Sequence, residues 1–302
     1  MCGIAGIFDN NSKRSPESLN KGLQMMLNAI KHRGPDDRGE KKIGSKNGIN
    51  IYLGHQRLSI IDPSQGGHQP MSNNDSTLWI STNSEIYNYR ELKDDLEHEY
   101  NFRSESDTEV LLRSYEVWGI DCLKKIRGMF AFAIWDDINN KLILARDRIG
   151  IKPLYYFSKN NIFIFSSELR GILASKIDKP GINPTGIFQY LSYGRIGSID
   201  SILDSIMEVP PGHFLVADKN GIKIQKYWDP FNENKLEKLE RLNELNVNLD
   251  LESFIMEACS RSDLFSDFSK KNKINALIVK PILDQKIECN NKPIIGFSFN
   301  YT

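Results

Sequence analysis

Four short apolar runs follow one another between residues 129 and 166, and no more than seven residues separate neighbouring runs. Parallel strands need a crossover connection of about a dozen residues or more, whereas antiparallel strands can be joined by short turns. We therefore expect antiparallel neighbours, with strands at Met129–Trp135, Lys141–Arg146, Leu154–Phe157 and Ile162–Ser166.

Capping signals predict helices between the strands, because serine and asparagine caps and a first-turn proline suit a helix start. The first helix should end before His32-Arg33-Gly34-Pro35, where glycine and proline stop it. Strands mixed with a few helices predict an α+β class, with the helices packed on sheet faces. The expected helices begin at Ser15-Pro16, at the capping-box pattern Ser106-Asp107-Thr108-Glu109 and at Asn183-Pro184, with another at Arg90–Glu97; the remaining expected strands are Gly3–Phe8, Ile51–Ile61, Leu78–Ser81 and His213–Val216.

The charges of the 302 residues balance, with 39 lysines plus arginines against 39 aspartates plus glutamates. This argues against a nucleic-acid or membrane partner held by bulk charge, and no run approaches the ~20 apolar residues of a membrane helix. The N-terminus has no secretory pattern. Cys2, Cys122, Cys259 and Cys289 have neither metal-ligand spacing nor the density of a disulfide scaffold, so a reducing, cytoplasmic setting is expected.

The composition changes after Trp228-Asp229-Pro230. Residues 231–252 are rich in Glu, Lys, Asn and Leu, and Leu236, Leu239 and Leu242 share one face of a charged amphipathic helix. The last ~70 residues are too few for a full second domain. We therefore expect one domain over residues 1–230 and a short helical remnant over residues 231–302.

Cys2 follows the initiator methionine directly. Removal of Met1 would leave a thiol and a free α-amine on one residue, and an α-amine titrates at about 7.7–8.0. Such an amine can activate its own side chain, as in N-terminal nucleophile hydrolases. Gly3 and Gly6 would let a substrate approach closely. From position alone, a chance cysteine at residue 2 explains the pattern equally well.

An ordered series of short motifs extends from residue 1 to about residue 230: Met1-Cys2-Gly3-Ile4-Ala5-Gly6, His32-Arg33-Gly34-Pro35-Asp36, Gly54-His55-Gln56-Arg57-Leu58-Ser59-Ile60-Ile61-Asp62, Gly67-His68-Gln69-Pro70-Met71, Glu85-Ile86-Tyr87-Asn88-Tyr89-Arg90, Ser106-Asp107-Thr108-Glu109, Arg127-Gly128-Met129-Phe130-Ala131-Phe132-Ala133, Ala145-Arg146-Asp147-Arg148, Gly150, Lys152-Pro153-Leu154-Tyr155-Tyr156, Ser167-Glu168-Leu169 and Pro211-Gly212-His213. Together these motifs resemble the class II glutamine amidotransferases, above all the glutamine-hydrolysing asparagine synthetases. Several motifs are weak individually, but their shared order makes chance a poor explanation.

The resemblance implies a four-layer αββα sandwich of two mainly antiparallel sheets, of the N-terminal nucleophile hydrolase type. It also implies hydrolysis of the side-chain amide of L-glutamine to glutamate and ammonia, for asparagine or related amide synthesis. In such a site Cys2 is the nucleophile and its own amine the base. The other implied roles are an oxyanion hole from the Asn83 amide and the Ser84 backbone N–H, a substrate-carboxylate contact from Arg57, a pocket lining from Leu58, Ser59, Ile60 and Ile61, and α-ammonium contacts from Glu85 and Asp107.

Simpler explanations of the same residues remain open. Arg57 could pair with a nearby acid on its strand, and Glu85 could be a surface acid before a helix. Asp107 suits the first turn of a helix, where the dipole favours a carboxylate. We assign no catalytic role to His55 or His68, although both fall within the motifs.

The chain departs from the family at Asn83-Ser84-Glu85, where the family has Asn-Gly-Glu. Serine keeps its backbone N–H, so the oxyanion donor need not be lost. A positive φ at this position would cost the serine about 1–3 kcal/mol or misdirect the donor. We therefore expect reduced glutaminase activity that the Ser84→Gly variant should raise.

The family also carries an ATP- and Mg-dependent synthetase domain with a Ser-Gly-Gly-x-Asp-Ser loop that cradles pyrophosphate. The corresponding stretch, Ser262–Leu283, contains no glycine, and the chain ends at Thr302. We therefore expect no cofactor for the glutaminase half and no complete ATP site. A separate synthetase subunit or a homodimer is a possible partner of such a glutaminase. The alternatives to an active glutaminase are a glutamine-binding or regulatory relative without turnover and a truncated asparagine synthetase product.

Overall fold

The structure is a computed structural model that describes residues 1–10, 14–44, 48–60, 62, 64–98, 100–196 and 200–229. Contacts divide the chain into one unit over Met1–Pro230 and another over Phe231–Thr302. The amphipathic helix expected at residues 231–252, the degenerate loop at 262–283 and the remnant as a whole lie outside the described residues. Within the described residues, no helix is both long and apolar enough to cross a membrane.

Two six-stranded sheets, antiparallel throughout, form the centre of the first unit. The first sheet has the order β10 (Ile206–Glu208), β8 (Tyr155–Lys159), β9 (Ile162–Ser166), β1 (Gly3–Asn10), β3 (Ile49–Arg57) and β2 (Asp37–Gly44). The second has the order β12 (Gly221–Lys226), β11 (His213–Asp218), β7 (Lys141–Arg146), β6 (Gly128–Asp136), β5 (Leu78–Ile86) and β4 (Met71–Ser72).

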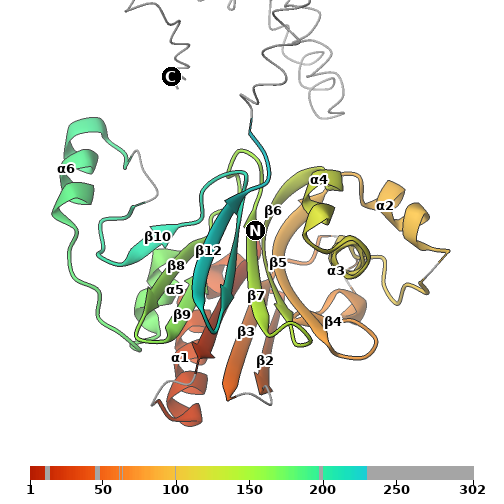
Figure 1. Cartoon of the computed structure of the whole chain (residues 1–302), viewed down its shortest axis with the longest axis horizontal. Helices are drawn as coiled ribbons and strands as arrows, with labels where there is room; N and C mark the ends of the chain where they lie inside the picture. The colour runs from red at the N-terminus through yellow and green to blue at the C-terminus, as the bar shows by residue number, and fades with distance from the viewer. Residues whose placement is uncertain are drawn as a thin grey trace, which may run out of the picture. The chain divides into compact units, whose positions relative to one another are not determined.

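Three apolar clusters stack the elements into four layers (Figure 1). One cluster fills the space between the sheets, where Ile4 and Phe8 of β1 meet Trp135 of β6. A second joins the outer face of the first sheet to α1 (Pro16–Ala29) and α5 (Leu169–Ala174). The third joins the second sheet to α2 (Tyr89–Leu96), α3 (Asp107–Trp118) and α4 (Cys122–Lys125). The expected α+β sandwich is confirmed.

The predicted helix starts form at their caps. The Ser15 side chain accepts the Ser18 N–H at the start of α1, and Asn183 caps α6 (Pro184–Tyr193). Ser106 caps α3 by accepting the Thr108 N–H. The predicted capping box does not form, however. The Glu109 carboxylate accepts the N–H groups of Arg103 and Ser104 instead of the N–H of the capping residue, Ser106.

Two strand boundaries differ from prediction at the place where the two sheets meet. The strand expected at Ile51–Ile61 ends at Arg57, because the next N–H groups bond to side chains instead of a neighbouring strand. The strand expected at Leu78–Ser81 continues to Ile86, paired with β6 along its whole length. Before Ile86, the extra residues of β5 carry polar side chains, so this part of the strand is not recognisable as an apolar run.

Candidate active site

The pairing of β1 with β3 places the residues that form the first wall of a pocket. Gly3 lies opposite Gln56 in the β1–β3 ladder, so Cys2 comes next to the point where β3 ends. The Leu58 N–H donates to Cys2 Sγ at 3.4 Å, and Sγ lies 3.6 Å from the Leu58 carbonyl oxygen. The Arg33 Nε–H donates to the Cys2 carbonyl oxygen at 2.9 Å. The thiol is thus held through its own sulfur and through its main chain.

Two buried polar bridges place the second wall opposite the first. The Ser81 hydroxyl donates to the Gly54 carbonyl at 3.0 Å, and His55 Nε2 donates to the Thr82 carbonyl at 3.0 Å. Burial lowers the His55 pKa to about 4, so its ring is neutral near pH 7. These bridges join β3 of one sheet to β5 of the other directly before Asn83.

The pocket between these walls has about 510 Å³ of empty space, part of it open to solvent. Most of the predicted site residues line it together. Ser59 does not line it, and its N–H donates to the Asp36 carboxylate at 2.8 Å. Ile61 lies outside the described residues. The predicted lining residues are Cys2, Arg57, Leu58, Ile60, Asn83, Ser84, Glu85 and Asp107, and the additional ones are Met1, Gly67, Gln69, Thr82, Ser106 and Thr108.

Burial raises the pKa of the Cys2 thiol, although the Leu58 hydrogen bond and the positive charges of the N-terminus and Arg57 act in the opposite direction. The thiol therefore needs a base to become a nucleophile near neutral pH. While Met1 is attached, the Cys2 nitrogen is a peptide amide and has no lone pair available for this purpose. Removal of Met1 is thus a requirement of the predicted mechanism.

Arg57 is buried at the end of β3, and its guanidinium holds the loop that follows. Nη1 donates to the Ser64 carbonyl at 2.9 Å, and Nη2 donates to the Asp62 carbonyl. Gly67 lies against the same group, because a Cβ there would come within 1.9 Å of Arg57 Nη2. The guanidinium is therefore fixed at the pocket wall, and its contact with a substrate carboxylate stays a prediction.

Within the described part of the chain, the edge of β5 that faces the pocket has no neighbouring strand beyond Ile80, where pairing with β4 ends. The Thr82 N–H donates instead to Gln69 Oε1 at 2.7 Å, and the Ile86 N–H donates to Asp107 Oδ2 at 3.0 Å. N–H groups two residues apart on a strand point the same way, so the Ser84 N–H is directed to this edge as well. Ser84 is not among the residues with a positive φ, so the strain considered for serine at this position does not arise.

Asn83 is 2% exposed, and its Nδ2 has no hydrogen-bond partner among the described residues. An unpaired buried amide N–H is costly unless a ligand or an ordered water satisfies it. Asn83 and the Ser84 N–H are thus two donors on adjacent residues of one pocket wall.

Two carboxylates complete this wall. Burial raises the Asp107 pKa to about 6, against the opposing hydrogen bonds from Ile86, Thr108 and Ser84. The Ser84 hydroxyl lies 3.5 Å from Asp107 Oδ2. Glu85 is half-exposed and pairs with the Lys152 ammonium at 3.2 Å. Within the described residues, no group of three or more His, Cys, Asp or Glu side chains could hold a metal ion.

Sequence reasoning quoted Arg33, Gln69 and Lys152 within motifs but gave them no role. Each acts on a site residue that is distant along the chain: Arg33 on Cys2, Gln69 on Thr82, and Lys152 on Glu85. Their presence in motifs was the only available signal. His55 and His68 do not line the pocket, and His68 Nδ1 lies 2.7 Å from the Asp37 carboxylate.

Comparisons with known proteins identify the family of the chain. A family model described as a glutamine amidotransferase domain matches residues 1–228. The putative asparagine synthetase (glutamine-hydrolyzing) 2 of Methanocaldococcus jannaschii is 41% identical over 246 residues, which cover 76% of this chain and 46% of that protein. The asparagine synthetase (glutamine-hydrolyzing) 3 of Bacillus subtilis is 36% identical over 236 residues, covering 76% and 37%. The chain thus spans less than half the length of these relatives.

A solved structure shares the fold at much lower sequence identity. The glutamine phosphoribosylpyrophosphate amidotransferase from B. subtilis, complexed with ADP and GMP, aligns with a TM-score of 0.55 at 19% identity. The alignment covers 75% of this chain and 49% of that one. It supports the arrangement of two antiparallel sheets with outer helices.

Proposed function

The chain belongs to the family of glutamine amidotransferase domains, and we propose that it hydrolyses the side-chain amide of glutamine to glutamate and ammonia through a thioester on Cys2. The observation that carries this proposal is the unpartnered Asn83 amide in the pocket that Cys2 lines. A buried donor beside a nucleophile suits an oxygen that becomes negative only during reaction.

The reaction begins when the free α-amine of Cys2, exposed by removal of Met1, accepts the thiol proton. Sγ then attacks the amide carbon, and the carbonyl electrons move to oxygen. The Asn83 Nδ2–H and the Ser84 N–H stabilise that oxyanion. Collapse of the tetrahedral intermediate expels ammonia, which takes its proton from the α-ammonium. A water molecule, deprotonated by the same amine, hydrolyses the thioester and releases glutamate.

Charge orients the substrate across the pocket. Arg57 on the first wall would attract the α-carboxylate, since a guanidinium fork matches a carboxylate in geometry. Glu85 and Asp107 on the second wall would attract the α-ammonium. Three charged groups thus select an amino acid zwitterion instead of a simple amide.

The fate of the ammonia forms the second part of the proposal. The two relatives are named asparagine synthetases, which favours aspartate as the acceptor. We propose that residues 231–302 correspond to the beginning of a synthetase domain, and that the ATP- and Mg-dependent step takes place on a separate synthetase subunit, because the stretch at 262–283 lacks the glycines of a pyrophosphate loop. Reconstitution tests this part: asparagine should form from glutamine only when a synthetase partner is added.

The central test combines mass spectrometry of the N-terminus with a glutaminase assay on the same sample. The mature chain should begin at Cys2, release glutamate from glutamine, and be labelled at Cys2 by an electrophilic glutamine analogue. Cys122 provides the matched control, because burial raises its pKa to about 12 and the analogue should leave it unmodified. Retention of Met1, or glutamine binding without turnover in a chain that begins at Cys2, would contradict the proposal.

A further inference from the structure

Lys152 is a buried cation that the proposed mechanism does not use. It is 3% exposed, and Glu85 is the only hydrogen-bond partner of its Nζ among the described residues, at 3.2 Å. A buried ammonium is unfavourable unless it is paired. Glu85 is 43% exposed, so water can solvate its carboxylate in the absence of this partner. The pair therefore fixes the place of a carboxylate that water alone would leave free to move.

The loop before Lys152 is held by the buried carboxylate of Asp147. Asp147 is 1% exposed and accepts the N–H groups of Lys152 at 2.9 Å and Ile151 at 2.9 Å. It also accepts the Phe130 N–H at 3.3 Å, and Phe130 lies opposite Ser84 in the β5–β6 ladder. Asp147 thus ties the loop to the part of the second sheet that carries Glu85.

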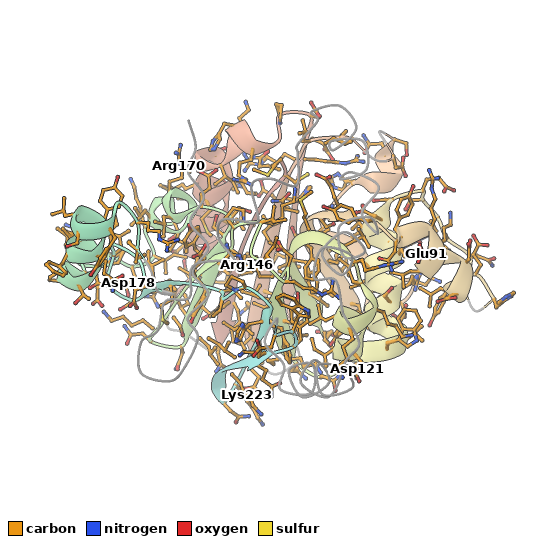
Figure 2. All side chains as sticks on the ribbon, turned by 90° about the horizontal axis from the view of Figure 1, so that it is seen from above. Glu91, Asp121, Arg146, Arg170, Asp178 and Lys223 are labelled. Carbon is orange, nitrogen blue, oxygen red and sulfur yellow. The ribbon has the colours of Figure 1, made fainter. Side chains whose placement is uncertain are left out.

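Arg146 holds the same loop from the other side. Its Nε donates to the Lys152 carbonyl at 2.8 Å, Nη2 to the Gly150 carbonyl at 2.8 Å, and Nη1 to the Val209 carbonyl at 2.8 Å. Figure 2 shows Arg146 near the middle of the domain, whereas Glu91 and Asp178 lie toward its periphery. Two buried charged residues therefore fix the main chain that directs the Lys152 side chain.

We propose that Lys152 is a positioning residue that orients the Glu85 carboxylate toward the α-ammonium of glutamine. A carboxylate has about four acceptor sites, so one bond to Lys152 leaves sites for a second cation. The inference rests on the proposed function, because it concerns how that site recognises its substrate. Lys152 acts on binding and not on the chemical step, since it contacts neither Cys2 nor Asn83.

The test compares glutamine with glutaramate, the analogue that lacks the α-ammonium. Lys152→Met should raise the KM for glutamine by about tenfold, leave kcat within about twofold, and leave glutaramate hydrolysis unchanged. Lys152→Arg should restore the KM to within about threefold, because it returns a cation to the same position. Adding Lys152→Met to Glu85→Gln should cause little further loss, since the two residues act together.

Lys141→Met is the matched control. It likewise removes a lysine from an ion pair with a carboxylate, here Asp136, but neither residue lines the pocket. It should leave both KM values unchanged. Equal losses for glutamine and glutaramate in Lys152→Met, or an unchanged KM for glutamine, would overturn the inference while the wild type remains active. A wild type that neither binds nor hydrolyses glutamine would overturn the proposed function together with it.

Discussion

The two walls of the pocket are held in different ways. Cys2 and Arg57 lie at the ends of β1 and β3, which are neighbours in one continuous ladder. Asn83, Ser84 and Glu85 lie on β5, whose pocket edge is satisfied by the side chains of Gln69 and Asp107 instead of a strand. The proposed nucleophile is therefore placed by main-chain pairing, whereas the proposed oxyanion and ammonium contacts lie on a strand edge that side chains satisfy.

The walls also differ in charge. Arg57 gives the first a cation, and Glu85 and Asp107 give the second two carboxylates. Under the proposed function, these charges would admit an amino acid zwitterion in one direction only. Changes on the first wall should therefore abolish the chemistry or disturb the carboxylate contact, while changes on the second should separate rate from binding.

Cys2→Ala should have the largest effect, because it removes the attacking sulfur. Glutamate release should fall by ~10⁴-fold or more, as for other covalent nucleophiles. The measurement is glutamate release, with glutamine binding by calorimetry to show that the pocket is intact. Cys122→Ala is the control and should keep its activity. Substantial turnover by Cys2→Ala would assign the chemistry to another group.

Asn83→Ala should lower kcat by ~10²–10³-fold with little change in KM, because the amide acts on an oxyanion that is absent from the bound substrate. Steady-state kinetics measure this division. Asn88→Ala is the control: Asn88 is also buried, but it bonds to Lys125 and Arg127 outside the pocket. It should lower stability and not kcat. A change confined to KM would make Asn83 a binding residue.

Asp107→Asn should change the pH dependence of both binding and stability. The folded chain keeps the Asp107 proton up to about pH 6, whereas an unfolded chain releases it near the ordinary pKa of 3.8. The group therefore stabilises the fold most below pH 3.8, and this contribution is lost as the pH rises through 6. Asp107→Asn should thus be more stable than the wild type at pH 8, by on the order of 2 kcal/mol in denaturant unfolding.

The same carboxylate should give glutamine binding an acid limb. In a Cys2→Ala background, calorimetry should show the wild-type pocket losing affinity as the pH falls through about 6, because a neutral Asp107 does not attract an ammonium. Asp107→Asn should bind weakly at all pH values. An affinity that does not depend on pH between 5 and 8 would leave Glu85 as the sole partner of the ammonium.

Gly67→Ala should have a moderate effect on the first wall. The added Cβ would lie 1.9 Å from Arg57 Nη2 and displace the guanidinium from the loop carbonyls. We expect the KM for glutamine to rise by about tenfold, with kcat within about threefold. Gly66→Ala is the control, since its Cβ would come no closer than 3.0 Å to any atom. Equal KM values for the two variants would show that the position of the Arg57 guanidinium does not affect substrate binding.

Ser84→Gly should have the smallest effect. Ser84 has no positive φ to relieve, and its N–H is already directed to the pocket edge. Removing the Ser84 hydroxyl, which lies beside Asp107, should raise glutamate release by less than about tenfold. No gain would show that serine is not a defect, whereas a gain of about a hundredfold would contradict the strand geometry of residue 84.

Local patterns explain which features the sequence could predict. The caps of Ser15 and Asn183 and the apolar strands from β6 to β9 follow from residues close together in the chain. The strand character of residues 82–85 could not be seen, because their side chains are polar and line the pocket. The end of β3 could not be seen either, because it depends on Cys2, which is 56 residues away.

The residues of the candidate site were predicted from sequence motifs. A motif names residues but does not show which distant residues they contact. Motifs named Cys2, Arg57 and Asp107, and the fold brings them to one pocket. They could not show that Lys152 reaches Glu85, because 67 residues separate the two. Contacts over such distances are set by strand order and not by any local pattern.

The pocket edge of β5, where side chains take the place of a neighbouring strand, has a consequence for the protein in solution. An exposed row of backbone donors invites pairing with a strand of another molecule, which is a common route to aggregation. Here the Gln69 amide and the Asp107 carboxylate occupy that row, so the groups that shape the pocket also keep the second sheet from growing. Variants that remove Gln69 would leave the Thr82 N–H without its acceptor, and a loss of solubility in such variants would show that this edge had become accessible to other molecules.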